Sequence, residues 1–372
     1  MGDVAKITMG QSPNSNNYTS NPKDYILVQG NADMKNGQVH PRVWTTEVTK
    51  TASKGDLILS VRAPVGDVGK TGYDVVIGRG VAAIQGNEFI YQLLRQMKAA
   101  GYWTRFSTGS TFESINSFEI HNAVINLPDK HEQIEIGKLL LSFDRIITLH
   151  EEKKRQLERL KSALLQKMFA EKQGYPVVRF KGFCDEWQGT KLGKVSKIVR
   201  GASPRPKSHP KWFDNDSNVG WLRISDVTSQ DGRIHHLEQH ISKQGQAKTR
   251  VISEPHLLLS IAATVGKPLI NYVKTGVHDG FLIFIEPHFD LEFMFQWLEM
   301  FRPQWSKYGQ PGSQINLNSD LVKNQIIYLP SREEQNQIGI FFNQIDSLIN
   351  LHQQKINNIN SVKKSLLQKM FI

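Results

Sequence analysis

The sequence predicts an α+β protein in which two β-rich globular segments are joined by a long antiparallel two-helix coiled coil. The first observation behind this prediction is an internal repeat, because residues 127–169 occur again without a gap at 329–371. The offset is 202 throughout, 18 of the 43 aligned positions are identical, and both copies end in LLQKMF. A repeat of this kind determines the architecture before any single motif is interpreted.

The globular segments are the second observation, because they repeat as well. Three pairs of stretches match, namely 2–13 with 193–204, 54–66 with 254–266, and 114–128 with 314–330. Runs rich in β-branched residues predict short strands in both copies. These runs are DYILVQG, GDLILSV and DVVIGRGVAAI in the first copy and VGWLRISDV, HLLLSIAAT and GFLIFIE in the second. Helical spacing of apolar residues predicts one short helix near 88–100 and one near 290–302.

Each repeated stretch predicts one helix of about 40 residues, which is about 60 Å long at 1.5 Å per residue. Asp129 and Ser331 each follow a proline and precede a glutamate by three residues (Glu132 and Glu334), which is the capping-box pattern. Alternating 3-4 spacing predicts a coiled-coil seam of about three heptads in each helix. The predicted seam residues are Phe143, Ile146, His150, Lys153, Leu157, Leu160 and Leu164 in the first helix, and Ile345, Leu348, His352, Lys355, Ile359, Val362 and Leu366 in the second.

Both predicted seams contain a histidine and a lysine at the same level. We interpret these residues as a polar layer that fixes register and helix orientation. A metal site is the alternative, but no carboxylate or third histidine stands at ligand spacing, so we predict no metal. A short linker leads from the first helix into the second globular copy, so pairing of the two helices has to be antiparallel. Duplication and antiparallel pairing together predict a pseudo-two-fold axis through the coil.

Composition narrows the class of partner. The chain has 46 Lys and Arg residues against 35 Asp and Glu residues, a formal net charge of +11. This balance favours an acidic partner such as nucleic acid, although basic charge also serves solubility alone. Cys184 is the only cysteine, which excludes a disulfide framework and fits a reducing cytoplasm. Apolar runs such as 257–263 are too short to span a bilayer.

No motif in the sequence predicts catalysis. Residues 63–72 contain GKT, but Pro64 stands where a Walker A motif needs glycine. The stretch IGRG at 77–80 lacks the third glycine of a dinucleotide fingerprint and favours a bulge or turn. Neither an NPPY or DPPY tetrapeptide nor a GxSxG motif occurs. We therefore predict no catalytic residue.

Polar and basic loops are the best candidates for a nucleic-acid interface. Arg, Asn and Gln pair with purine edges, while Lys, Ser and backbone amides hold phosphates. The alternative is that these loops are merely solvated turns, but equivalent loops occur in both copies. The candidates in the first copy are Gln11, Ser12, Asn14, Arg62, Arg79, Tyr102, Arg105, Ser107, Thr108 and Ser110. The candidates in the second copy are Arg200, Ser203, Arg205, Lys207, Arg223, Lys267, Lys307, Tyr308, Gln310, Ser313 and Gln314.

The alternation of variable segments with LPxxxEQxxIG…LLQKMF helices resembles the specificity subunit of type I restriction–modification systems. The linker PVVRFKGFCDEWQGTKLG at 176–193 is also typical of that family. The resemblance covers essentially the whole chain. It implies a target recognition domain at 1–128, a first conserved helix at 129–172, a linker at 173–192, a second target recognition domain at 193–330 and a second conserved helix at 331–372.

The resemblance also implies a function. Each target recognition domain would read one half of a bipartite double-stranded DNA sequence, and the paired helices would set the spacer. Two modification subunits would bind S-adenosylmethionine and methylate adenine N6, and motor–nuclease subunits would cut unmethylated DNA. This chain would bind no cofactor itself, and we expect its partners to dock on the charged outer face of the helices. The alternatives are a specificity module of a type IIB-like assembly and a coiled-coil adaptor that binds no DNA.

Overall fold

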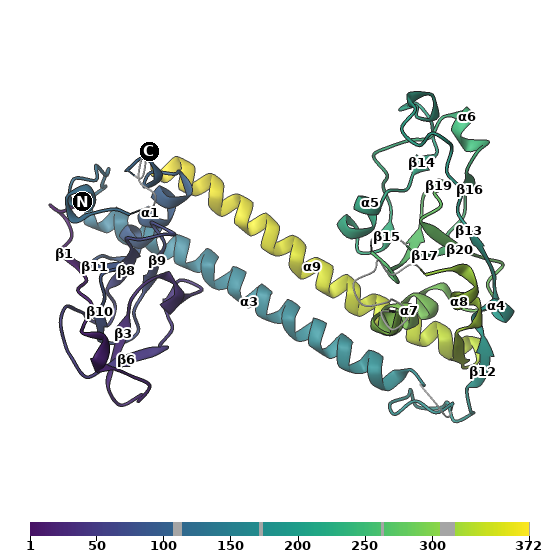
Figure 1. Ribbon diagram of the computed structural model, residues 1–372, viewed down its shortest axis with the longest axis horizontal. Helices are drawn as coiled ribbons and strands as arrows, with labels where there is room; N and C mark the ends of the chain where they lie inside the picture. The colour runs from purple at the N-terminus through teal and green to yellow at the C-terminus, as the bar shows by residue number, and fades with distance from the viewer. Residues whose placement is uncertain (107–113, 171–173, 262–263, 306–316, 372) are drawn as a thin grey trace. The chain divides into compact units, whose positions relative to one another are not determined.

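The computed structural model describes residues 1–106, 114–170, 174–261, 264–305 and 317–371 (Figure 1). The chain divides into two compact units, Met1–Glu151 with Gln354–Ile372 as unit 1 and Glu152–Gln353 as unit 2. The division passes through both long helices, α3 (Lys130–Met168) and α9 (Arg332–Met370). Each unit therefore consists of one globular segment and part of both long helices.

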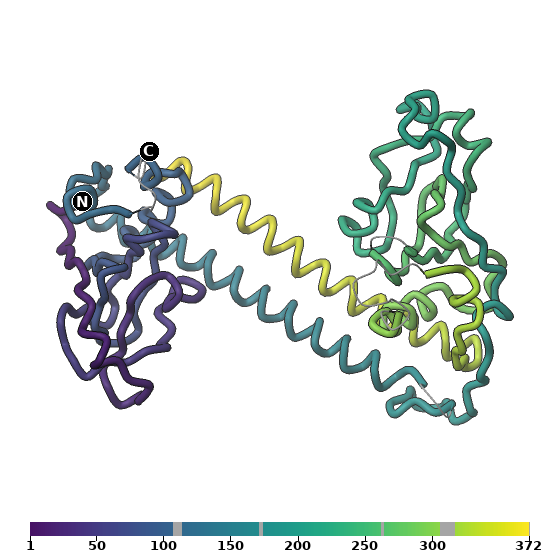
Figure 2. Tube along the Cα trace, viewed as in Figure 1, coloured from purple at the N-terminus to yellow at the C-terminus, as the bar shows by residue number. Residues whose placement is uncertain are grey.

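Unit 1 contains two sheets with the strand orders β1-β11-β8-β9-β5-β4 and β2-β6-β3-β10-β7. Its core joins the first sheet to α1 through Leu57, Ile84, Phe89 and Leu94, all of which are buried. The short elements are β1 (Ile7–Met9), η1 (Ser15–Asn17), β2 (Tyr18–Thr19), β3 (Tyr25–Val28), η2 (Asn31–Asp33), β4 (Met34–Lys35), β5 (Gln38–Val39), β6 (Val43–Thr45), β7 (Thr51–Ala52), β8 (Leu57–Ser60), β9 (Val68–Lys70), β10 (Val75–Ile77), β11 (Val81–Ile84), α1 (Glu88–Ala99), η3 (Thr104–Phe106) and α2 (Ser117–His121). The end of α9 lies beside α1, with the rings of Phe371 and Phe89 4.8 Å apart (Figure 2).

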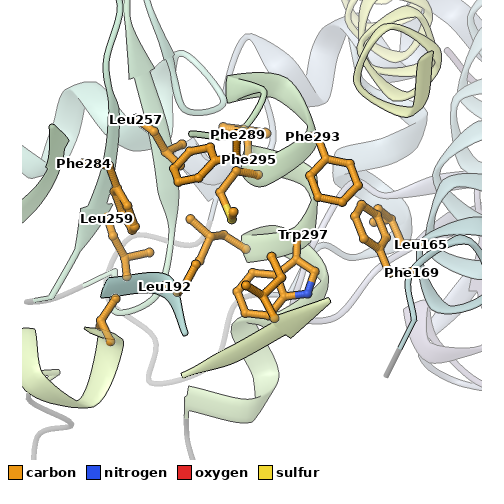
Figure 3. Packing of buried hydrophobic residues seen from close by; sticks show 14 of the residues in the cluster. Leu165, Phe169, Leu192, Leu257, Leu259, Phe284, Phe289, Phe293, Phe295 and Trp297 are labelled. Carbon is orange, nitrogen blue, oxygen red and sulfur yellow. The ribbon is translucent and has the colours of Figure 1, made fainter. Parts of the chain in front are cut away.

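Unit 2 contains three sheets with the strand orders β13-β20-β17-β18-β15, β14-β19-β16 and β12-β21. Figure 3 shows its main core, in which Phe169 at the end of α3 meets Phe293 of α7 at 5.1 Å between ring centroids. The short elements are β12 (Gln188–Lys191), α4 (Leu192–Val195), β13 (Lys197–Arg200), η4 (Pro210–Trp212), β14 (Gly220–Trp221), α5 (Ile224–Ser229), β15 (Arg233–Ile234), α6 (Lys243–Gln246), β16 (Arg250–Ile252), β17 (Leu257–Ser260), β18 (Pro268–Asn271), β19 (Thr275–Val277), β20 (Phe281–Ile285), α7 (Leu291–Trp305), α8 (Ser319–Asn324) and β21 (Ile326–Leu329).

The two long helices run antiparallel within each unit and are joined there by a partly buried ion pair. In unit 1 the ammonium of Lys363 donates to the Asp144 carboxylate at 2.5 Å. In unit 2 Lys161 donates to Asp346, also at 2.5 Å. The two pairs are related by the repeat offset of 202, with the roles of α3 and α9 exchanged. The internal repeat thus builds the same interhelical contact twice.

The same aspartates attach each globular segment to the coil. Gln92 and Arg95 of α1 donate to the Asp144 carboxylate at 2.8 and 2.9 Å. In unit 2 the equivalent aspartate accepts from Gln296 of α7 at 2.8 Å and from Arg233 at 3.1 Å. Burial would raise the pKa of Asp144, but the hydrogen bond from Lys363 and the charge of Arg95 lower it. Each aspartate is therefore a charged junction between two long helices and one globular segment.

The predicted seam is wrong at every second position. The shared residues Phe143, His150, Leu157, Leu164, Ile345, His352, Ile359 and Leu366 are at least partly buried. The predicted residues Ile146, Lys153, Leu160, Leu348, Lys355 and Val362 are exposed instead, and the residue that follows each of them takes its place: Ile147, Lys154, Lys161, Ile349, Ile356 and Lys363. Apolar spacing alone could not select this phase, because both phases place lysines in the seam. Lys161 and Lys363 face inward because each meets a carboxylate there.

The shift of phase exposes apolar side chains along one edge of the coil. We call these residues the apolar edge: Ile146, Leu149 and Val362 in unit 1, and Leu160, Leu348 and Leu351 in unit 2. Their side chains are 41–53% exposed, whereas Lys363 in the seam is only 5% exposed. Ile146, Leu160, Leu348 and Val362 each directly precede a seam residue, and such positions share one edge of an antiparallel pair. The expected charged outer face is therefore apolar along this edge.

Substituting Asp346 with alanine should lower the free energy of unfolding of unit 2 by about 3 kcal/mol, since Lys161 and Arg233 would lose their buried carboxylate. The measurement is a urea unfolding curve of the full chain. Asp320→Ala is the control, because its side chain is 83% exposed where it faces Lys323 and should change nothing measurable. Equal unfolding midpoints for the two variants would rule out a structural role for the junction.

Candidate nucleic-acid interface

Each unit contains a loop that leaves an edge strand and runs against a tight turn. In unit 1 the backbone N–H of Gly10 donates to Val81 at 3.0 Å, and that of Gln11 donates to Ile77 at 2.9 Å. Unit 2 repeats both bonds at the corresponding residues, at 2.9 and 3.0 Å. We call this loop and turn the loop pair, and it is the most closely repeated feature of the globular segments.

Glycine is required where the loop crosses the turn. A Cβ on Gly10 would lie 2.1 Å from the carbonyl oxygen of Gly78, and one on Gly201 would lie 2.1 Å from that of His278. No side chain larger than hydrogen fits at that distance in either unit. The sequence GxSP at 10–13 and 201–204 therefore encodes a rigid backbone crossing, with polar side chains displayed beside it.

A serine ties the loop to the turn in both units. The hydroxyl of Ser12 accepts the backbone N–H of Arg79 at 3.1 Å, and that of Ser203 accepts the backbone N–H of Asp279 at 3.2 Å. Positions 79 and 279 are therefore structurally equivalent. They carry opposite charges, so the repeated frame displays different chemistry in the two units.

In unit 1 the loop pair borders a hollow of about 710 Å³, here called hollow one. Its lining includes three guanidinium groups and several hydrogen-bonding side chains, from Ser12, Tyr18, Gln29, Asn31, Arg42, Arg62 and Arg79. Arg42 is neutralised by Asp33 at 3.0 Å. In the part of the chain that the structure describes, neither the Arg62 guanidinium nor the terminal nitrogens of Arg79 have a partner. Hollow one therefore offers unpaired cationic donors.

In unit 2 the equivalent hollow of about 370 Å³ is called hollow two, and its cations are already paired. Asp279 accepts from Ser203 and Lys207 at 2.7 Å and from Arg205 at 2.9 Å. Burial would raise the pKa of Asp279, but these donors and the positive charges outweigh it and lower the pKa to about 2. Arg223 is bound by Asp226 and Glu238. Hollow two therefore has charged walls that are internally neutralised.

The loop pairs bring together part of the predicted interface. The members that line the hollows are Ser12, Arg62, Arg79, Ser203, Lys207 and Arg223, and Arg200 and Arg205 bond Asp279 beside hollow two. Gln11 belongs to the loop pair through its backbone, and Asn14 accepts the backbone N–H of Asn16 in the same loop. Tyr102 and Arg105 lie elsewhere in unit 1, where the guanidinium stacks 3.6 Å from the ring centroid. Ser107, Thr108, Ser110, Lys307, Tyr308, Gln310, Ser313 and Gln314 lie outside the described residues.

The interpretation of Lys267 needs correction. Its side chain is only 16% exposed, and its ammonium lies 3.7 Å from carboxylate oxygens of both Asp231 and Glu299. These contacts favour a structural role, because a partly buried lysine held by two carboxylates is poorly placed to reach a phosphate. Its place after a glycine in a basic chain suggested a DNA contact, and the sequence contained no sign of the acidic partners.

Several residues in the hollows were missed in the sequence. Tyr18, Gln29 and Arg42 line hollow one, and Trp221 and His278 line hollow two. Gln29, Arg42 and Trp221 come from stretches in which the two copies do not align, whereas Tyr18 closely follows the first GxSP loop. Alignment of the glycines in IGRG (77–80) and VHDG (277–280) is the signal that could have identified His278.

Two properties bear on other classes of site. Among the described residues, no group of three or more His, Cys, Asp or Glu side chains is placed to hold a metal ion. No helix within the described ranges combines the length and apolar character needed to cross a bilayer.

The chain belongs to a known family. The family model described as "Type I restriction modification DNA specificity domain" matches residues 1–159 and again 184–361. The two matches correspond to the two copies of the internal repeat, so each copy contributes one globular segment and most of one long helix.

Curated relatives come from Methanocaldococcus jannaschii. The chain is 32% identical over 166 residues to the putative type I restriction enzyme MjaX specificity subunit. The matched region covers 43% of this chain and 39% of that protein. The chain is 24% identical over 277 residues to the type I restriction enzyme MjaVIII specificity subunit. This second matched region covers 70% of this chain and 64% of that protein. The chain thus spans well under half of the first relative and somewhat less than two thirds of the second.

Solved structures support the fold. The S subunit of a type I restriction–modification system from M. genitalium superposes with a TM-score of 0.64 at 14% identity, covering 100% of this chain and 94% of that one. A chain from a structure of type I R-M complex assembly and conformational transition gives a TM-score of 0.58 at 18% identity, covering 99% and 95%.

Substituting Asp279 with asparagine should remove a pH-dependent contribution of the Asp279 ion pairs to the free energy of unfolding. The lowered pKa means that the carboxylate stabilises unit 2 by about 2 kcal/mol above pH 4, and that this contribution is lost as the pH falls toward 2. The wild type should therefore exceed the variant in free energy of unfolding at pH 6, and the difference should shrink toward pH 2. A difference that is independent of pH in denaturant titrations would contradict the proposed ion pairing.

Proposed function

We propose that this chain is the DNA sequence-specificity subunit of a type I restriction–modification complex and reads a bipartite target, one half-site per unit. The observation that carries this proposal is the loop pair, which has the same glycine crossing and serine bond in both units but different side chains in the two hollows. Identical frames with different chemistry suit two readers of different base sequences. The net charge of +11 favours the DNA backbone as the common partner.

Hollow one has the chemistry of a guanine reader. Arginine contacts the O6 and N7 atoms of guanine through two parallel donors, and this is the commonest specific base contact. Arg62 and Arg79 have unpaired guanidinium nitrogens within the described residues, next to the hydroxyl of Ser12. The paired Arg42 adds shape without free charge. Base discrimination in unit 1 is therefore assigned to these two arginines.

We assign recognition to this chain and chemistry to its partners. Two modification subunits bind S-adenosylmethionine and methylate adenine N6 in the flipped base, and motor–nuclease subunits complete the restriction complex. The side chains of the hollows include cations and hydrogen-bonding groups, and in hollow two also apolar groups, which suit the holding of bases and phosphates. The chain is accordingly non-catalytic in this proposal.

The apolar edge is the docking surface proposed for the modification subunits. A group of neighbouring apolar side chains that are about half exposed on a coiled coil indicates a protein–protein contact surface. The edge forms once in each unit from residues related by the offset of 202, so the chain offers two similar surfaces. Two similar surfaces suit two copies of the same partner. The recognition segments attach through Asp144 and Asp346, which follow seam residues and lie along the opposite edge.

Exchanging residues 193–313 for the same segment of another family member should change one half-site only. The measurement is methylome sequencing of cells that express the exchanged chain with its modification partners. A change in both half-sites would contradict one reader per unit. Binding to duplex DNA that is no stronger than to an unrelated acidic polymer would favour the adaptor alternative instead.

Leu149→Asp and Leu351→Asp should each release one modification subunit, because a carboxylate would replace an apolar contact in one copy of the apolar edge. The double variant should bind neither subunit. The measurement is the stoichiometry of the assembled complex by sedimentation. Val177→Asp is the matched control, since its apolar side chain is 82% exposed and does not belong to the apolar edge. Two subunits retained by the double variant would exclude this surface.

A further inference from the structure

Hollow two contains a histidine, His278, whereas no histidine lines hollow one. His278 lies on the turn of the loop pair, where unit 1 has Gly78, and it lines the hollow with Trp221, Ile224 and Pro204. Its ring packs 4.7 Å from the ring of Phe281 and 5.8 Å from that of Trp221. The ring is therefore held in place by packing on an apolar wall.

The tautomer of His278 follows from its backbone contact. The N–H of Gly280 donates to Nδ1 at 2.8 Å, so Nδ1 is an acceptor and carries no proton. Burial and the charge of Lys207 lower the pKa of His278 to about 4, against the opposing effect of Asp279. The neutral ring therefore carries its proton on Nε2, and no described residue bonds that nitrogen. Hollow two thus presents one neutral N–H donor.

The charged groups of the hollow supply no second reader. Lys207 is held by Asp279, and Arg223 is held by Asp226 and Glu238. The Asp279 carboxylate in turn accepts three side-chain donors, so it has little capacity left for a base amino group. The neutral imidazole is the donor that lies beside the apolar wall, and the hydroxyl of Ser225 lines the same hollow.

We propose that hollow two reads a thymine, with O4 accepting from Nε2–H of His278 and the 5-methyl group lying against Trp221, Ile224 and Pro204. In the major groove thymine presents this combination of one acceptor and one methyl group. Guanine offers two acceptors but has no methyl group to lie against the apolar wall. Cytosine presents an amino donor that would face the imidazole donor, and adenine places its amino donor beside N7. This inference rests on the proposed function, since it specifies what unit 2 recognises.

The test uses the chain assembled with its modification subunits and duplexes that carry the methylation target of the wild-type complex. Each thymine in the half-site assigned to unit 2 is replaced by cytosine or by uracil, and dissociation constants are measured at one salt concentration. For one thymine, cytosine should weaken binding roughly tenfold. Uracil, which lacks only the methyl group, should weaken it roughly fourfold.

His278→Gly, which restores the residue found in unit 1, should reduce both penalties at that thymine to within about twofold and leave other positions unchanged. Gly280→Ala keeps the imidazole but places a Cβ 2.5 Å from its Cε1, so the ring must move. The Gly280→Ala variant should lose the same discrimination at that thymine. It replaces His278→Gly in the experiment if the His278→Gly variant does not fold. His236→Gly is the control, because His236 is exposed in the same unit and outside the hollow.

The outcomes separate the two levels of the proposal. A half-site without thymine, or His278 and Gly280 variants that keep full discrimination at every thymine, would overturn the thymine assignment while leaving sequence recognition intact. A wild-type complex that binds all duplexes equally would overturn the proposed function itself.

Discussion

The structure depends on a partly buried lysine–aspartate ion pair that is formed twice. Lys161 with Asp346 and Lys363 with Asp144 determine which face of each long helix turns inward. A lone buried ammonium or carboxylate is costly to desolvate, so each group requires its partner in place. Sliding one helix along the other would separate both pairs at once. The pairs therefore select one register from several that apolar packing alone would tolerate.

The same interaction links helix pairing to recognition. Each aspartate also accepts from a glutamine on the short helix of its globular segment, Gln92 or Gln296. The arginine that completes each junction comes from different places, Arg95 in α1 and Arg233 in β15. The two copies thus keep the geometry of the junction while obtaining one of its donors from different elements. The globular segments can diverge because each aspartate needs a guanidinium group nearby, and that group can come from different positions in the sequence.

Much of this architecture was predictable, and the exceptions have physical causes. The repeat predicted the two long helices, and the matched GxSP stretches predicted equivalent loops because only glycine permits the crossing at Gly10 and Gly201. The seam phase was not predictable from apolar spacing, since it depends on the carboxylates of Asp346 and Asp144, which receive Lys161 and Lys363 from the other long helix. The hollows were only partly predictable, because Gln29, Arg42 and Trp221 come from stretches that do not align between copies. Contacts across such distances depend on sheet topology, which local patterns do not encode.

The apolar edge has a consequence for the life of the chain before assembly. Six half-exposed aliphatic side chains on the helical pair favour aggregation while no partner covers them. The net charge of +11 opposes aggregation by repulsion between chains, and salt screens this repulsion. If the proposed partners cover this surface, an unassembled chain would be open to chaperones and proteases. Supply of the specificity chain in excess of its partners would be self-limiting, so the ratio of subunits in the cell would be held by degradation as well as by synthesis.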